Sequence, residues 1–137
     1  MRLKQFFLMS AILWTLAILT VCWMPMSKLV EDDGSRSWMF TIPYFDKLVH
    51  FGIFMIFAIL WFLASDRSRP WRRIFTAGIL LAAITEIVQT LPVIGRQADL
   101  DDAACDLLGV AAGILFIGWF LAYLGRQQTP ALAQTPA

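Results

Sequence analysis

Four long apolar runs, separated by charged segments, constrain the fold of this chain most. They cover residues 6–24, 48–64, 74–91 and 103–124. A helix needs about 20 residues to cross the hydrocarbon of a bilayer, with a range of about 17 to 25, so each run is long enough. The 59% hydrophobic and 15% charged residues also lie outside the averages for soluble domains. We therefore predict an all-α polytopic membrane protein, with a bundle of four transmembrane helices in residues 1–124.

Basic residues near the ends of the runs predict how the helices are threaded. Seven of them flank the N-terminus, the loop between runs two and three, and the end of run four: Arg2, Lys4, Arg67, Arg69, Arg72, Arg73 and Arg126. The other two loops mix four basic residues with seven acids. The positive-inside rule then places both termini in the cytoplasm, an N-in/C-in topology. The first run lacks a small-residue cleavage site and is interpreted as a retained helix, and the polar residues 125–137 are predicted to form a disordered cytoplasmic tail.

This threading brings polar residues of three helices to the outer face. The second run enters from outside, the third ends there, and the fourth starts there, so their polar ends should meet. A charged group facing lipid is unfavourable, and these side chains should therefore point into the bundle. The predicted pocket consists of Asp46, Lys47, His50, Glu86, Gln89, Arg96, Asp99, Asp102 and Asp106.

Asp106 is the pocket residue that helix capping does not explain. The other acids of the segment 98–109 lie at a helix start, where carboxylates cap free amides and suit the positive end of the dipole. Asp106 lies a turn deeper, inside the apolar run. It therefore needs a proton or a cationic partner, and Lys47, His50 and Arg96 are the cations expected near it.

Several pocket residues have two interpretations. His50, the only histidine, either bonds Asp46 or a backbone carbonyl, or serves as a proton carrier or ligand. Glu86 and Gln89 either form a functional site or hold the third helix to the fourth. Arg96 either forms an interfacial salt bridge or binds a phosphate or carboxylate headgroup.

Two glycines continue the acidic face of the fourth run. Gly109 and Gly113 project within an arc of about 80° that also contains Asp102 and Asp106, at 100° per residue. A Gly-x-x-x-Gly spacing permits close helix approach. We expect it to serve packing inside the bundle, with oligomerisation as the alternative.

Three sequence blocks resemble the VanZ-like family of small bacterial membrane proteins. They are Asp46-Lys47-x-x-His50-Phe51-x-x-Phe54, Glu86-x-x-Gln89, and Arg96-x-x-Asp99-x-x-Asp102-x-x-x-Asp106-x-x-Gly109-x-x-x-Gly113. The resemblance covers roughly residues 38–121, and the family often has Asn where this chain has Asp106. The family takes its name from a protein linked to low-level teicoplanin resistance. The resemblance thus implies a multi-pass protein of the bacterial plasma membrane that acts in the cell envelope, with a link to glycopeptide resistance as an expectation.

Composition and motifs narrow the function. A net charge of +1 gives no reason to expect nucleic acid as a partner. No nucleophile, P-loop or dinucleotide motif occurs, so no cofactor is expected, and no spacing is diagnostic of a metal site. Cys22 and Cys105 fit small buried packing residues.

Three functional hypotheses remain. The favoured one is a binding protein whose outward pocket engages membrane lipids, a lipid-linked precursor headgroup or a glycopeptide-type amphiphilic antibiotic. The second is a membrane enzyme that uses Glu86, Asp106 or His50 as acid and base on a lipid-linked substrate. The third is a proton- or ion-coupled carrier. Whether the protein is an enzyme is left open by the sequence.

Overall fold

The computed structural model describes residues 2–24, 44–65, 70–94 and 99–132, and only the backbone of residues 128–132. Four helices make up these ranges: α1 (Arg2–Cys22), α3 (Phe45–Ala64), α4 (Trp71–Gln89) and α5 (Leu100–Leu132). The described residues contain no strand, which confirms the prediction of an all-α fold.

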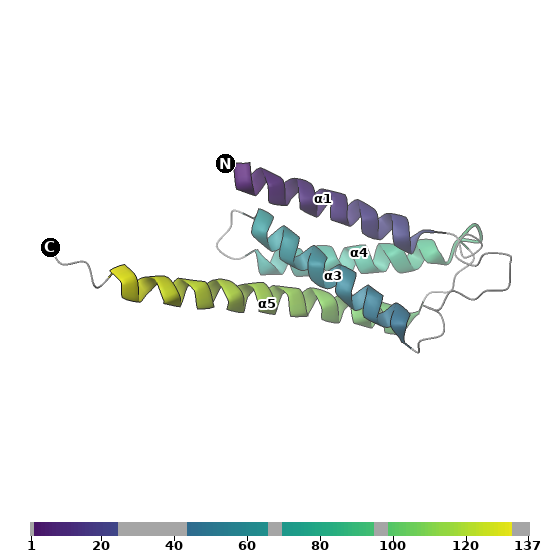
Figure 1. Ribbon diagram of the computed structural model, residues 1–137. Helices are drawn as coiled ribbons and strands as arrows, with labels where there is room; N and C mark the ends of the chain where they lie inside the picture. Colours follow the sequence, from purple (N-terminus) through teal and green to yellow (C-terminus); the bar gives the residue numbers. More distant parts are fainter. Residues whose placement is uncertain (1, 25–43, 66–69, 95–98, 133–137) are drawn as a thin grey trace.

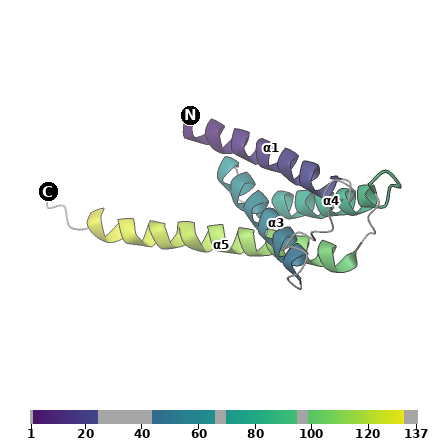
Figure 2. The same cartoon turned by 45° about the vertical axis from the view of Figure 1, so that its right-hand side comes forward.

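The helices form an elongated bundle (Figure 1). In both cartoon views α1 and α5 lie at opposite edges, with α3 and α4 between them (Figure 2). The start of α1, the end of α3, the start of α4 and the end of α5 lie at the same end of the bundle (Figure 1). The start of α3, the end of α4 and the start of α5 therefore share the other end.

Three of the helices are long and apolar enough to cross a membrane. They are α1, α3 and residues 100–127 of α5, in which an 18-residue stretch has a mean hydropathy of 2.0, 2.1 and 2.2, respectively. The 19 residues of α4 include Arg72, Arg73 and Glu86, and this helix is not among the three. Many large apolar side chains also face outward, such as Leu115 at 72% exposure. Such a surface suits hydrocarbon as its solvent, and the protein is a membrane protein.

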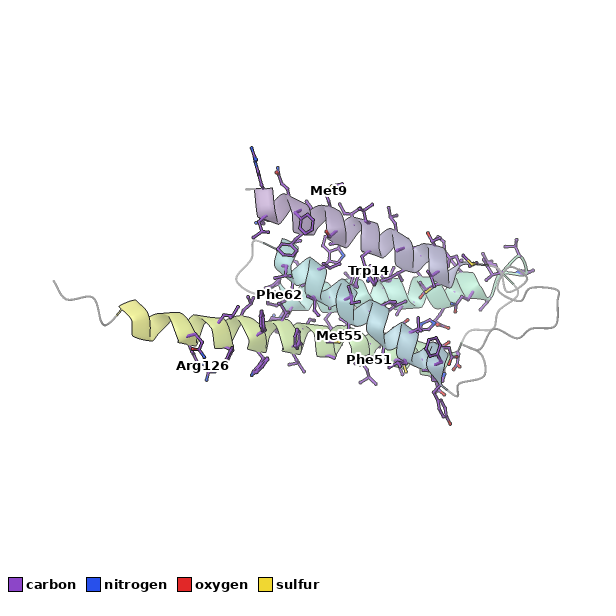
Figure 3. The ribbon with its side chains drawn as sticks, in the orientation of Figure 1. Met9, Trp14, Phe51, Met55, Phe62 and Arg126 are labelled. Carbon is purple, nitrogen blue, oxygen red and sulfur yellow. The ribbon has the colours of Figure 1, made fainter. Side chains whose placement is uncertain are left out.

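Glycines set the closest helix contact, between α3 and α5. A Cβ on Gly109 would collide with the carbonyl oxygen of Phe51, and a Cβ on Gly113 would lie 2.5 Å from that of Met55. Figure 3 labels Phe51 and Met55 where α3 crosses α5. Only residues without a side chain allow the two backbones to approach so closely.

Helix α1 is held to α3 by two tryptophans. The Trp14 Nε1–H donates to the carbonyl oxygen of Ile53 at 2.9 Å, and the Trp61 Nε1–H donates to Thr15 Oγ1 at 3.1 Å. These bonds satisfy indole donors that would otherwise be isolated in an apolar core. The buried core beneath them includes Ile18, Phe54, Phe57, Ala58, Leu81 and Val110.

The helix boundaries differ in two places from those of the apolar runs. Helix α3 begins at Phe45, before the second run, because its polar first turn is also helical. Helix α5 continues past residue 124 to Leu132, into the segment expected to be disordered. Arg and Gln, which follow Gly125, are good helix formers and allow this extension. Residues 133–137 lie outside the described part of the chain.

Candidate functional site: a polar cluster at one end of the bundle

Side chains of α3, α4 and the start of α5 form a polar cluster at the end of the bundle opposite the start of α1. We use this name for one group of residues: Lys47, His50, Glu86, Asp99, Asp101, Asp102 and Asp106. The first two lie near the start of α3, Glu86 near the end of α4, and the aspartates at the start of α5. The antiparallel order of α4 and α5 brings these ends together.

Lys47 forms ion pairs with the three more exposed aspartates of the cluster. Its Nζ lies 3.0 Å from Asp99 Oδ2, 3.0 Å from Asp102 Oδ1 and 3.9 Å from Asp101 Oδ2. The side chain of Asp102 is 16% exposed, that of Asp101 80%. Since exposed ion pairs contribute little, the pairs with Asp99 and Asp102, which are charge-assisted hydrogen bonds, carry most of the attraction.

Asp99 also caps α5. Its Oδ1 accepts a hydrogen bond from the Asp101 amide at 2.9 Å, and its carbonyl oxygen accepts from the amides of Asp102 and Ala103. Asp99 precedes the helix, and the hydrogen bond from Lys47 lowers the pKa of its carboxyl below the usual range. Asp99 is therefore expected to remain charged, as suits the positive end of the α5 dipole.

His50 and Asp106 form the buried floor of the cluster. His50 Nδ1 lies 2.9 Å from Asp106 Oδ1, and His50 Nε2 lies 4.0 Å from Asp102 Oδ2. Asp106 is fully buried and His50 is 7% exposed. With an Nδ1–H that donates to the carboxylate, the pair is a charge-assisted hydrogen bond in a dry setting. The partner that Asp106 needs is therefore His50.

Glu86 connects α4 to the start of α5. Its Oε2 accepts a hydrogen bond from the Asp99 amide at 2.8 Å. Its other oxygen, Oε1, is buried without a hydrogen-bond partner among the described residues, as is Oδ2 of Asp106. Buried carboxylate oxygens nearly always have a donor, because desolvation without one is unfavourable. These two carboxylate oxygens, Glu86 Oε1 and Asp106 Oδ2, can therefore each accept a hydrogen bond from a further donor.

The cluster is acidic as a whole. It contains five carboxyl groups, from Glu86 and the four aspartates, against Lys47 and His50. An excess of carboxylate acceptors favours cations and groups rich in N–H or O–H donors. The described residues contain no group of three or more His, Cys, Asp or Glu side chains arranged to hold a metal ion.

Three residues of the predicted pocket are not in the described cluster. Asp46 is exposed on the first turn of α3, and His50 is paired with Asp106 instead. Gln89 is buried but points to α1, where its Nε2–H donates to the carbonyl oxygen of Cys22 at 3.2 Å. Arg96 lies outside the described residues.

One member of the cluster was missing from the predicted pocket. Asp101 lies within 3.9 Å of Lys47, but its position at a helix start made capping a sufficient explanation. The signal that would have included it is the run of three acids Asp99, Asp101 and Asp102, more than one helix start needs.

The fold and the cluster define a class: a helical membrane protein with an apolar outer surface and, at one end, an acidic polar cluster with a buried floor. The family model described as VanZ/LLP1 matches residues 6–122. The chain therefore belongs to the VanZ/LLP1 family, which confirms the resemblance and extends it through α1. No curated protein and no solved structure matches the chain.

Proposed function

We propose that this VanZ/LLP1 protein binds a donor-rich component of the bacterial cell envelope, or an amphiphilic antibiotic such as a glycopeptide, through its polar cluster. The observation that carries the proposal is the pair of buried carboxylate oxygens, on Glu86 and Asp106, that have no partner among the described residues. A ligand with ammonium or hydroxyl groups would supply the missing donors.

The excess of acids narrows the ligand chemistry. Among the described residues, the cluster has five carboxyl groups against Lys47 and His50, so an amino sugar or another hydroxyl-rich headgroup fits better than a bare phosphate. Glycopeptide antibiotics and lipid-linked precursors both present such groups on an amphiphile. The apolar outer surface next to the cluster suits the hydrophobic part of these molecules.

We also propose that α4 is the fourth transmembrane span and that both chain ends are cytoplasmic. Arg72 and Arg73 lie in the first turn of α4, where long side chains reach the interface. Glu86 lies near its other end, inside the polar cluster. The stretch between them, residues 74–85, has no charged side chain. The positive-inside rule then places the polar cluster on the extracytoplasmic side.

Ligand binding by the purified protein tests the main proposal. Glu86→Gln removes the charge but keeps an acceptor for the Asp99 amide. A lost hydrogen bond to a charged group is worth about 1.5 to 3 kcal/mol, so binding of teicoplanin or of an amino-sugar headgroup lipid should weaken at least about tenfold. Asp46→Asn removes an exposed acid from the same end and is the matched control. Equal binding by wild type and Glu86→Gln would contradict the proposal.

One observation favours a second candidate, a membrane enzyme. Asp106 holds Nδ1 of His50 at 2.9 Å, as carboxylates orient the imidazole of a general base. In this candidate Nε2 of His50 takes a proton from water or from a hydroxyl of a lipid-linked substrate. Incubation with an envelope lipid extract should then yield a product with wild type and none with His50→Asn. Absence of any product with wild type would refute this candidate and leave binding.

A further inference from the structure

A cavity lies along α4 between its first turn and Ile84, and none of its lining residues belongs to the polar cluster. Its volume is about 670 Å³, within the range of ligand sites. α1, α3 and α4 supply its walls, and the residues used below are Thr15, Trp61, Arg73, Ala77, Leu80 and Ile84. We call this cavity the α1–α4 groove.

The lining of the groove favours an apolar ligand. Its two inner polar groups already bond each other and the backbone: the Thr15 hydroxyl donates to the carbonyl oxygen of Ala11 at 2.8 Å and accepts from Trp61 Nε1 at 3.1 Å. Leu80 and Ile84 line its far part and are 58% and 47% exposed. A hydrocarbon chain would cover these side chains and leave no polar group unsatisfied.

The end of the groove next to Arg73 favours an anionic group. Arg73 lines the groove in the first turn of α4, and its neighbour Arg72, which is not a lining residue, lies 5.1 Å from the ring centroid of Trp71. Both belong to the first turn of α4, which contains no acid and whose N-cap, Pro70, gives no side-chain hydrogen bond. The guanidinium group of Arg73 and the positive end of the helix dipole favour a phosphate at this end of the groove.

The length of the groove matches one bilayer leaflet. From Arg73 to Ile84, a separation of eleven residue steps along α4, the rise is roughly 16 Å at 1.5 Å per residue. The hydrocarbon core is about 30 Å thick, so half of it is about 15 Å. A lipid whose headgroup lies at Arg73 would thus place its acyl chain along the whole groove.

We propose that the α1–α4 groove binds one anionic phospholipid, with an acyl chain between α1 and α4 and its phosphate at Arg73. A net negative headgroup charge adds attraction to Arg73 that a zwitterionic headgroup lacks. This site is separate from the polar cluster and does not depend on what the cluster binds.

Native mass spectrometry of the full chain in detergent, with added phosphatidylglycerol or phosphatidylcholine, tests the proposal. We expect wild type to retain one phosphatidylglycerol and to prefer it over phosphatidylcholine. Arg73→Gln should weaken retention of phosphatidylglycerol at least about tenfold, as expected for a lost charge-assisted hydrogen bond. Ala77→Trp places an indole in the groove and should abolish retention.

Matched variants make the outcome decisive. Ala83→Trp adds the same bulk on an exposed position of α4 that does not line the groove, and Arg126→Gln removes an exposed arginine from α5. Both should retain lipid as wild type does. Equal retention of the two lipids by wild type, or equal retention by Ala77→Trp and Ala83→Trp, would overturn the proposal. A dimer that Ala77→Trp dissociates would also overturn it, because a second copy would then fill the groove.

Discussion

Replacing Gly109 by alanine tests the close approach of α3 and α5. The added Cβ would collide with the carbonyl oxygen of Phe51 and would lie 3.1 Å from the amide nitrogen of Met55. Both atoms belong to the α3 backbone and cannot rotate away. The helices must therefore separate by on the order of 1 Å, which forfeits part of the dispersion energy along their contact.

The magnitude follows from two opposing effects. Overpacking of this kind costs about 1 to 3 kcal/mol, and rigid backbone atoms favour the upper end. Alanine is a better helix former than glycine by about 1 kcal/mol. We therefore expect Gly109→Ala to lower the free energy of unfolding by about 2 kcal/mol. Unfolding by dodecyl sulfate in mixed micelles, followed by circular dichroism, measures this value.

Gly118 supplies the control on the same helix. A Cβ at Gly118 would have no atom within 4 Å, so Gly118→Ala should be neutral or stabilising by up to about 1 kcal/mol. If Gly109→Ala and Gly118→Ala agree within about 0.5 kcal/mol, the described contact between α3 and α5 is wrong.

Two more predictions concern single side chains. Gln89→Ala removes the buried hydrogen bond to the Cys22 carbonyl and should lower the free energy of unfolding by about 1 to 3 kcal/mol. Gln127→Ala, at an exposed position of α5, is the control and should change this free energy little. Equal losses in the two variants would contradict the contact between α4 and α1. The lowered pKa of Asp99 stabilises the protein above the usual Asp range, and this contribution is lost as the pH falls through the lower, folded-state value. Acid unfolding from about pH 5 downward should therefore be shallower in Lys47→Met than in wild type, and identical profiles would refute the assigned cause.

The apolar runs predicted the helices because hydrocarbon demands long unbroken apolar segments. They predicted the polar ends less well, because hydropathy does not show whether a polar first turn is helical. Helix α3 accordingly starts at Phe45, ahead of its run. For α4 the same rule is weakest, since Arg72, Arg73 and Glu86 shorten its uncharged stretch.

The sequence alone did not predict that His50 is the residue that pairs with Asp106. Charge and threading limited the partners of Asp106 to three cations at one end, but the register between α3 and α5 selects His50. That register depends on which backbone atoms Gly109 and Gly113 contact, and spacing along one helix does not reveal this.

Gln89 shows that two residues on the same side of a helix can contact different neighbouring helices. Residues three apart on a helix differ by about 60° around its axis. This angle is enough for Glu86 to contact the start of α5 while Gln89 contacts α1. The sequence grouped both side chains in one pocket, whereas in the structure Glu86 contacts the start of α5 and Gln89 contacts α1.

The central claim is that His50 pairs with Asp106 inside one polar cluster built by α3, α4 and α5. Because His50 is the only histidine, ¹⁵N-histidine labelling of the micellar protein yields the nitrogen resonances of a single imidazole. We predict a hydrogen-bonded Nδ1–H that exchanges slowly with water, shifts strongly in Asp106→Asn and stays unchanged in Asp46→Asn. A resonance that responds to Asp46→Asn but not to Asp106→Asn would contradict the account.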